Sequence, residues 1–288
     1  MIGFLGINKP SGITSAQLLN KIKFVLRQHG DKTKIGHMGT LDELASGVLV
    51  VAFGKATRLF DLFSKKHKTY DTTFKFGEET TTLDTEGEVV EKSNKLPTEA
   101  EILAILPSFI GKQMQMPPKY SAKKIDGSPA YKLARQNKDF TLKPKEIEIY
   151  ALDLIEQEDE CCFSFEVVCS SGTYIRSLAR DLAHALGTVG IAEDIVRVKC
   201  GVFNNANSLF ENQLNMENIK SNLVPPADAL PWIKTLSVTD ETFKNLLDGK
   251  KIDIAEADGN YFAKNESGDI MIIEVEKNKA KISINLKD

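Results

Sequence analysis

The sequence contains no apolar run near the ~20 residues that a membrane-spanning helix needs. Its start, MIGFLGINKPSG, lacks the basic lead and long apolar segment of a signal peptide. Its four cysteines have no CxxC spacing, and its four histidines are scattered along the chain. These absences argue against a membrane protein, a secreted protein and a zinc site. We therefore expect a cytoplasmic protein with reduced thiols and no bound metal.

The size and composition are those of an ordinary globular protein. The chain has 288 residues, of which 42% are hydrophobic and 27% are charged. This is enough for one substantial core and a second, smaller domain. The composition shifts at PPADALPW, which is typical of a linker and begins at Pro225. We expect a first domain over residues 1–224 and a small β-rich domain over residues 225–288.

Charge is segregated along the chain, although its net value is only −3. Residues 1–70 hold eleven lysines and arginines against four acidic residues, and residues 112–145 hold nine against two. In the second block, tyrosines alternate with lysines, a combination that suits phosphate contact and base stacking. Two basic blocks on an acidic protein indicate a polyanion site. Solvated lysine-rich faces would give the same counts.

The stretch Gly36–Gly47, GHMGTLDELASG, combines several glycines with an imidazole and two carboxylates. Glycine permits backbone conformations closed to other residues and a close approach to a ligand. The apolar run Val48–Gly54 follows and predicts a buried strand that holds the loop in place. Asp42, at the centre, is a candidate catalytic carboxylate. A short acidic residue can also simply cap its own turn.

Two further segments carry candidate site residues. The run Lys68–Gly77 alternates like a strand and places Tyr70 near one end of its apolar face, where a tyrosine also commonly belongs to the core. A helix with a buried stripe follows SSGTY and carries Arg176 in its first turn. Because the helix dipole disfavours a cation there, we expect a fixed carboxylate beside it. A solvent-facing arginine is the alternative.

GHMGTLDELASGVLVVAFGKATR closely resembles the signature motif of the TruB family of pseudouridine synthases. Four more blocks resemble that family in the same order: NKPSGITS, KTYDTTFKFG, SSGTYIRSLARDL and DIVRVKCGVF. The family isomerises the T-loop uridine at tRNA position 55. The resemblance therefore implies an enzyme that needs no cofactor, acts on the T arm of tRNA and flips the target base out of its stack.

The resemblance also assigns roles to single residues. It implies that Asp42 is catalytic, that Arg176 pairs with it, and that Tyr174 and Ile195 contact the substrate. Tyr70 would stack on the target base and is the family's candidate proton-transfer group. A phenol with a pKa of about 10 can act as a base only if the site lowers that pKa.

Other assignments rest on position within a motif. Lys9 is expected to project from the turn beside the active site, although a surface charge would look the same. His37 is expected to contact the RNA, although a lone histidine is commonly structural. Val196 occupies a position where most family members carry an arginine, which puts the RNA contact of that arginine in doubt. Residues 112–145 resemble the family's RNA-binding thumb insertion.

These patterns predict an α+β protein with a mixed, largely antiparallel sheet flanked by helices, the pseudouridine synthase fold. The C-terminal region resembles a PUA-like domain, but a β domain that only stabilises the core fits as well. We expect a monomer. The carboxylate either attacks ribose C1′ or takes a proton from C2′, and the sequence does not choose.

Two rival functions remain at this point. A nucleoside glycosidase usually needs two carboxylates within ~5 to 10 Å of each other, and Glu43, next to Asp42, should point elsewhere. A non-catalytic RNA-binding or tRNA-folding protein needs only the basic blocks and the aromatic residues.

Overall fold

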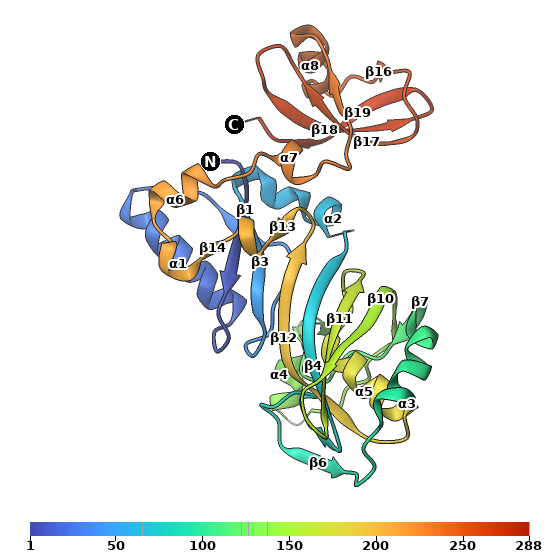
Figure 1. Cartoon of the computed structure of the whole chain (residues 1–288). Coiled ribbons are helices and arrows are strands. Elements are labelled where there is room, and N and C mark those ends of the chain that lie inside the picture. Colours follow the sequence, from blue (N-terminus) through green and yellow to red (C-terminus); the bar gives the residue numbers. More distant parts are fainter. Residues whose placement is uncertain (65, 122, 126, 137, 288) are drawn as a thin grey trace.

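The computed structural model describes residues 1–64, 66–121, 123–125, 127–136 and 138–287 (Figure 1). Within these residues, most strands belong to one large sheet and one small one. The large sheet contains β1 (Gly3–Lys9), β2 (Ile35–His37), β3 (Ser46–Phe53), β4 (Lys68–Phe76), β7 (Gly111–Gln115), β10 (Lys145–Gln157), β11 (Cys162–Cys169), β12 (Gly190–Cys200), β13 (Phe203–Asn204) and β14 (Leu209–Phe210). The small sheet contains β15 (Thr235–Ser237), β16 (Ile252–Asp253), β17 (Gly259–Lys264), β18 (Ile270–Glu276) and β19 (Lys279–Asn285).

The large sheet is mixed and largely antiparallel, as the sequence predicts. Its main path runs β14-β1-β3-β12-β4-β11-β10-β7, while β2 pairs with β3 and β13 with β12. The pairs β1–β14 and β3–β12 are parallel, and the other pairs on this path are antiparallel. Strand β12 therefore joins two antiparallel halves at the centre of the sheet.

Two hairpins and a set of helices complete the chain. The hairpins are β5 (Glu78–Thr80) with β6 (Val89–Lys92), and β8 (Lys124–Ile125) with β9 (Ser128–Pro129). The α-helices are α1 (Ser15–Gln28), α2 (Phe60–Phe63), α3 (Glu99–Ile105), α4 (Ala130–Arg135), α5 (Ile175–Ala185), α6 (Met216–Ser221), α7 (Pro226–Ala229) and α8 (Asp240–Leu247). The 3₁₀ turns are η1 (Gly54–Leu59), η2 (Leu106–Phe109), η3 (Asn205–Asn207) and η4 (Glu211–Gln213). No described helix is long and apolar enough to cross a membrane.

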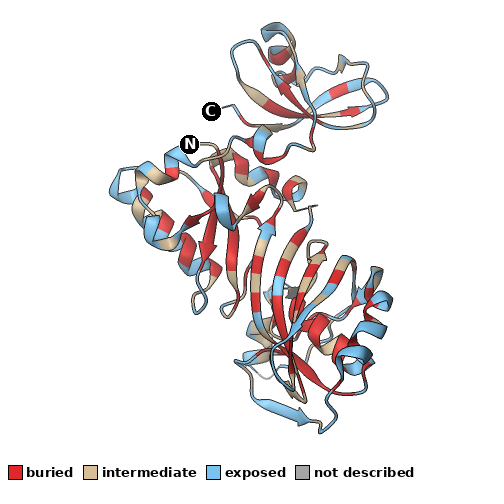
Figure 2. Ribbon diagram, viewed as in Figure 1, coloured by how far each residue is buried: buried red, intermediate tan, exposed pale blue. Residues whose placement is uncertain are grey.

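The apolar run after the Asp42 loop is explained by burial on both faces of β3. Leu49, Val51 and Phe53 face a core shared with α1, α3 and α5, while Val48 and Val50 face a second core. A strand covered on both sides reads as a continuous hydrophobic run rather than an alternating one. The central strands are mostly buried, and the β6 edge is exposed (Figure 2). The loop before β3 is thus anchored in a well-packed part of the sheet.

The small sheet is packed against the large one through a shared hydrophobic cluster. Phe4 stacks on Phe63 with ring centroids 5.4 Å apart, and the cluster continues into Phe262 and Ile272 of the small sheet. Figure 1 shows this sheet beyond the start of β1, close to the N-terminus. The C-terminal region is therefore β-rich, as expected, and part of its core is common to both sheets.

Candidate active site

The loop around Asp42 connects β2 to β3 and is held by the turn that follows β1. The Ser15 hydroxyl donates to the Leu41 carbonyl at 2.8 Å and accepts from the Leu41 amide at 2.9 Å. The amide of Gly12 donates to the Glu43 carbonyl at 2.9 Å. These bonds fix the backbone on both sides of Asp42. The NKPSGITS block thus acts here as a support for the loop.

Gly47 closes the loop where β3 meets β12, and its position requires a glycine. Its φ is +94°, in the left-handed region. A Cβ at Gly47 would lie 2.3 Å from the Arg197 carbonyl oxygen. No side chain fits at that separation, so only glycine lets the two strands approach so closely here.

The carboxylate expected beside Arg176 is Asp42, and the predicted pair is present. Arg176 Nη2 lies 2.7 Å from Asp42 Oδ2. The Arg176 side chain is only 6% exposed, whereas that of Asp42 is 43% exposed. A buried guanidinium and a partly open carboxylate form a strong, oriented ion pair. Asp42 is thereby held in a fixed orientation, with part of its surface free for a ligand.

Arg176 has further partners that sequence reasoning missed. Its Nη1 lies 3.2 Å from Asp84 Oδ2 and donates to the Thr82 carbonyl at 2.7 Å. Its Nη2 also donates to the Tyr120 carbonyl at 3.0 Å. These groups offset the unfavourable helix dipole at the start of α5. They come from the β5–β6 hairpin and the lysine-rich block, segments whose meeting point the sequence alone does not reveal.

A cavity of about 220 Å³ opens beside Asp42. Its lining brings together residues from the loop before β3, from β4, from α5 and the loop before it, and from β12. The residues are Gly39, Thr40, Leu41, Asp42, Ala45, Lys68, Tyr70, Ser171, Gly172, Thr173, Tyr174, Ile175, Arg176 and Ile195. Five predicted site residues, Asp42, Tyr70, Tyr174, Arg176 and Ile195, are in this set. Asp42 is the one carboxylate among the described residues that line the cavity.

Tyr70 is almost fully buried, and its environment does not favour a role as a base. Burial raises the pKa of its phenol well above the usual value, while the nearby Arg197 guanidinium opposes that rise without cancelling it. The lowered pKa that a tyrosine base requires is therefore not found. The phenol stays protonated at neutral pH and can offer a ring face or a hydrogen-bond donor.

Tyr174 stands at the N-terminus of α5, where its backbone is clamped by a buried glutamine. The Tyr174 amide donates to Gln115 Oε1 at 2.9 Å, and Gln115 Nε2 donates back to the Tyr174 carbonyl at 3.1 Å. Burial raises the pKa of the Tyr174 phenol. Gln115 lies on β7, at the start of the lysine-rich block. That block therefore begins beside the cavity and helps to position its wall.

Lys68 is a cavity residue that the prediction overlooked. Its Nζ donates to Ser171 Oγ at 3.2 Å, and burial lowers its pKa to about 8, with Arg197 acting in the same direction. The signal was available in the sequence, because Lys68 is two residues before Tyr70 and must share its strand face. A lysine of this kind places an amine in the wall of the pocket.

Lys9 does not project from the turn, contrary to the prediction. It is 1% exposed, and its Nζ donates to the carbonyls of Pro10 at 2.9 Å, Ile13 at 2.6 Å and Glu43 at 3.3 Å. Burial lowers its pKa to about 8. An ammonium group can satisfy its three donors by turning inward onto carbonyls. Lys9 therefore supports the Asp42 loop and is absent from the described cavity lining.

His37 lies on β2, and it too is absent from the described lining. Its Nδ1 is buried without a hydrogen-bond partner among the described residues. Burial lowers the pKa of the imidazole, and the cations Arg197 and Lys68 lower it further. His37 is therefore neutral at neutral pH in this structure.

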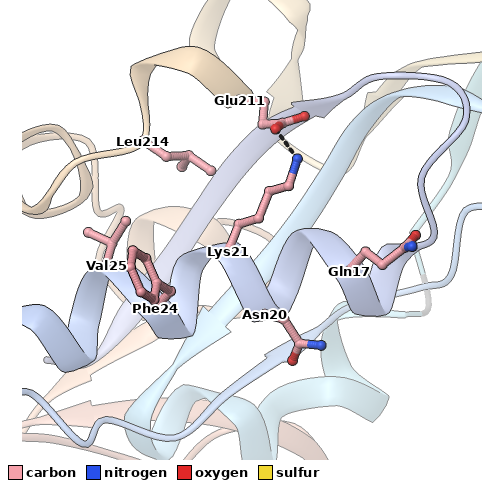
Figure 3. A pocket seen from close by; sticks show the side chains of 7 residues that line it. All are labelled: Gln17, Asn20, Lys21, Phe24, Val25, Glu211 and Leu214. Carbon is pink, nitrogen blue, oxygen red and sulfur yellow. Dashed lines mark hydrogen bonds and ion pairs between the residues drawn. The ribbon is translucent and has the colours of Figure 1, made fainter.

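Two other features could hold a ligand but lie away from this cavity. Asp159, Cys161 and Cys162 form a cluster at the end of β11 opposite the cavity. Burial raises the pKa of the Cys162 thiol, which donates a hydrogen bond to Glu193 Oε2 at 3.2 Å. A hollow of about 440 Å³ lies between α1 and η4 (Figure 3). It is bridged by the ion pair of Lys21 with Glu211. Neither contains any of the predicted catalytic residues.

Comparison with known proteins agrees with the motifs. Residues 27–175 match the family model described as TruB family pseudouridylate synthase, N-terminal domain. The tRNA pseudouridine synthase B of Gluconobacter oxydans (strain 621H) is 40% identical over 265 residues, which cover 88% of this chain and 78% of that protein. The tRNA pseudouridine synthase B of Clostridium kluyveri is 36% identical over 279 residues, which cover 97% of this chain and 93% of that protein.

A solved structure shares the fold at much lower sequence identity. A chain from an H/ACA RNP bound to a substrate RNA containing 2′-deoxyuridine superposes with a TM-score of 0.73 at 19% identity. The match covers 99% of this chain and 85% of that chain. Both sheets therefore belong to an arrangement that occurs in another protein of this architecture.

Proposed function

This chain belongs to the TruB family of pseudouridine synthases, and from that premise we propose that it converts uridine to pseudouridine at position 55 in the T loop of tRNA. Asp42 is the catalytic carboxylate of this proposal. The observation that carries it is the ion pair of Asp42 with the buried Arg176 in the wall of the cavity. An ionised, oriented carboxylate beside a base-sized pocket is what the reaction requires.

The chemistry is an isomerisation, so it needs no external reactant. The bond between uracil N1 and ribose C1′ breaks, the base turns, and a bond from C5 to C1′ forms. The hydrogen on C5 leaves as a proton, and N1 gains a proton. Asp42 either attacks C1′ or takes a proton from C2′, and both routes use the same carboxylate in its ionised form.

The cavity walls divide the remaining work. The Tyr70 and Tyr174 rings receive the flipped base, and Ile195 supplies an apolar contact. Because the Tyr70 phenol keeps its proton, we assign it to stacking and hydrogen bonding rather than to proton abstraction. Enclosure by these side chains keeps water from capturing the ribose while the base is detached.

Three further residues complete the proposed site. Arg176 holds the Asp42 carboxylate in a fixed orientation. His37 contacts the RNA near the loop, in keeping with its place in the matched motif. Lys9 acts through the loop backbone, because its Nζ is bound to three carbonyls.

We propose that tRNA is gripped by the lysine-rich block from residue 112 to residue 145, of which residues 122, 126 and 137 lie outside the described part. Its described basic side chains include exposed Lys132 and Arg135, and the Arg135 guanidinium lies 5.9 Å from the centre of the Tyr131 ring. This pairing of cations with aromatic rings suits an RNA loop.

The remaining parts of the proposal concern organisation. We propose a catalytic domain over residues 1–224 and a small PUA-like domain over residues 225–288. The enzyme works as a monomer, without metal, in the cytoplasm where tRNA is matured. The core shared by the two sheets supports a fixed placement of the second domain on the first.

The rival functions fit the site less well. A glycosidase would need a second carboxylate in the cavity. Asp84 is 3% exposed and bound to Arg176, and it is absent from the described lining. A protein that only binds RNA would have no use for a buried guanidinium that holds a half-open carboxylate.

The test of position is to map pseudouridine in an unmodified tRNA transcript after incubation with the protein, using carbodiimide adducts and primer extension. We expect one new stop at position 55. A matched transcript with cytidine at that position should give none. Modification at another uridine would keep the synthase activity and overturn the assignment of the target.

A further inference from the structure

Arg197 is among the largest fully buried side chains of the described residues, at 1% exposure, and the reaction scheme above does not use it. It lies on β12, next to Val196. A charged group is rarely buried so completely unless it is paired. Its surroundings therefore need an explanation.

The guanidinium is satisfied by carbonyl oxygens instead of a carboxylate. Nε donates to the Val48 carbonyl at 2.7 Å, Nη2 to the Gly39 carbonyl at 3.1 Å, and Nη1 to the Thr40 carbonyl at the longer distance of 3.4 Å. Arg197 takes part in none of the ion pairs among the described residues. Three of its five N–H donors are thus directed at one segment of backbone.

That segment is the loop that carries Asp42. Gly39 and Thr40 lead into Asp42, and Val48 follows the loop at the start of the buried strand. Arg197 also pairs with Gly47 in the short parallel ladder between β12 and β3. One side chain therefore joins the two ends of the loop at the place where the loop leaves the sheet.

The site also has local features that depend on this contact. A Cβ at Gly39 would lie 2.8 Å from Lys68 Nζ and 3.9 Å from Arg197 Nη1, so the loop lies directly on these two cations. The φ of Gly39, +145°, also favours glycine at this position. Ser15, Gly12 and Lys9 hold the loop at Leu41 and Glu43. Arg197 holds it at Gly39 and Thr40, the two residues that precede Leu41.

We propose that Arg197 is a positioning residue for catalysis, which fixes the Asp42 loop through its three backbone carbonyls and thereby sets the place of the Asp42 carboxylate. The proposal rests on the function proposed above for Asp42. The planar fork of an arginine can meet several carbonyls in fixed directions, which a lysine cannot do. Misplacement of a reacting group by about 1 Å can cost about 10²-fold in rate.

The experiment compares Arg197→Met with Lys199→Met, an exposed position on the same strand. Single-turnover rates and tRNA dissociation constants are measured for both, and hydrogen exchange is followed by mass spectrometry. We expect Arg197→Met to lower the single-turnover rate constant about 10²-fold with a dissociation constant within about threefold of wild type. Exchange should accelerate in peptides covering residues 36–48 and stay unchanged in α5. Lys199→Met should behave as wild type in each measurement.

If Arg197→Met does not fold, the same measurements are made on Arg197→Lys. It retains a cation but not the fork, so we expect its rate to remain at least about tenfold below wild type. A rate within threefold of wild type in a folded Arg197 variant would overturn the proposal. A loss of rate without faster hydrogen exchange in the loop would also overturn it. The same holds for a loss of rate that is no larger than the fraction of unfolded protein explains.

An Asp42→Asn protein in the same series separates this inference from the function on which it rests. It should be inactive while its loop exchanges as in wild type. An active Asp42→Asn protein would refute the proposed catalytic role and leave the link between Arg197 and the loop to be judged by exchange alone.

Discussion

The cavity around Asp42 and the lysine-rich block beside it are built in opposite ways. In the cavity wall and in the loop support behind it, cationic side chains are buried and bound to fixed partners: Arg176, in the wall, to two carboxylates, and Lys9, in the support, to carbonyls. In the block, Lys132 and Arg135 are exposed. Buried, fully bonded groups hold atoms in place, whereas exposed cations contribute long-range attraction that salt weakens. We therefore expect the cavity to control the rate and the block to control the affinity.

The largest effect should follow removal of the carboxylate. Asp42→Asn keeps the shape of the side chain but removes its charge, so the single-turnover rate should fall by at least about 10³-fold. The tRNA dissociation constant should stay within about twofold. Asp153→Asn, the same exchange at an exposed site on β10, is the control. A large loss of affinity in Asp42→Asn would mean that the cavity also governs binding. The division between a cavity that controls the rate and a block that controls the affinity would then be wrong.

Removing Arg176 should affect both rate and stability. Asp84, 3% exposed, would be left buried without its cation, which typically costs about 3–5 kcal/mol of unfolding free energy. Urea denaturation of Arg176→Met measures this loss. In the double variant Arg176→Met, Asp84→Asn, most of the stability should return while the rate stays low. Return of the rate with the stability would show that Arg176 only supports the fold.

Neutralising the block should change affinity alone. In the double variant with Lys132→Gln and Arg135→Gln, we follow the slope of the logarithm of the tRNA binding constant against the logarithm of the salt concentration. This slope should become shallower by about 0.7–0.9 per lost phosphate contact. The rate at saturating tRNA should not change. The control is the double variant with Lys92→Gln and Lys244→Gln, which removes the same charge from exposed positions elsewhere. Equal salt slopes in the two double variants would exclude the block from the RNA site.

The smallest effect should appear in the pH dependence of stability. Burial lowers the pKa of Lys68 to about 8, against about 10.4 in an unfolded chain. Between these values the unfolded chain binds more protons, so the free energy of unfolding rises with pH. Between pH 7.5 and 9.5 the free energy of unfolding of the wild type should therefore rise by about 1–2 kcal/mol more than that of Lys68→Met. Parallel curves in urea titrations would show that the amine is not desolvated.

The sequence predicted those features that depend on local pattern. The buried strand after the Asp42 loop and the stripe of α5 follow from periodicity. The mixed sheet was predicted with the help of the family resemblance. The pairing of Asp42 with Arg176 followed from one unfavourable position in a helix together with the family motif. The family motifs also placed residues that are far apart in the chain, such as Asp42, Tyr70 and Ile195, in one site.

What the sequence did not predict depends on where side chains turn in three dimensions. Lys9 was expected to project from the turn beside the active site, but its amine turns inward onto three carbonyls. Asp84 and Gln115 gave no local signal, because their partners lie on segments that meet only in the folded protein. Tyr70 has the right position, but its pKa depends on burial and on Arg197. Lys68 was overlooked although its strand face was known.

The central claim is that Asp42 makes and breaks the bonds of pseudouridine formation. It is tested most directly by tritium release from a tRNA transcript labelled at uridine C5, because C5 loses its hydrogen only when the base is reattached there. We expect release by the wild type and by Asp153→Asn, and none by Asp42→Asn despite normal tRNA binding. Release by Asp42→Asn at the wild-type rate, or free uracil in place of released tritium, would contradict the account.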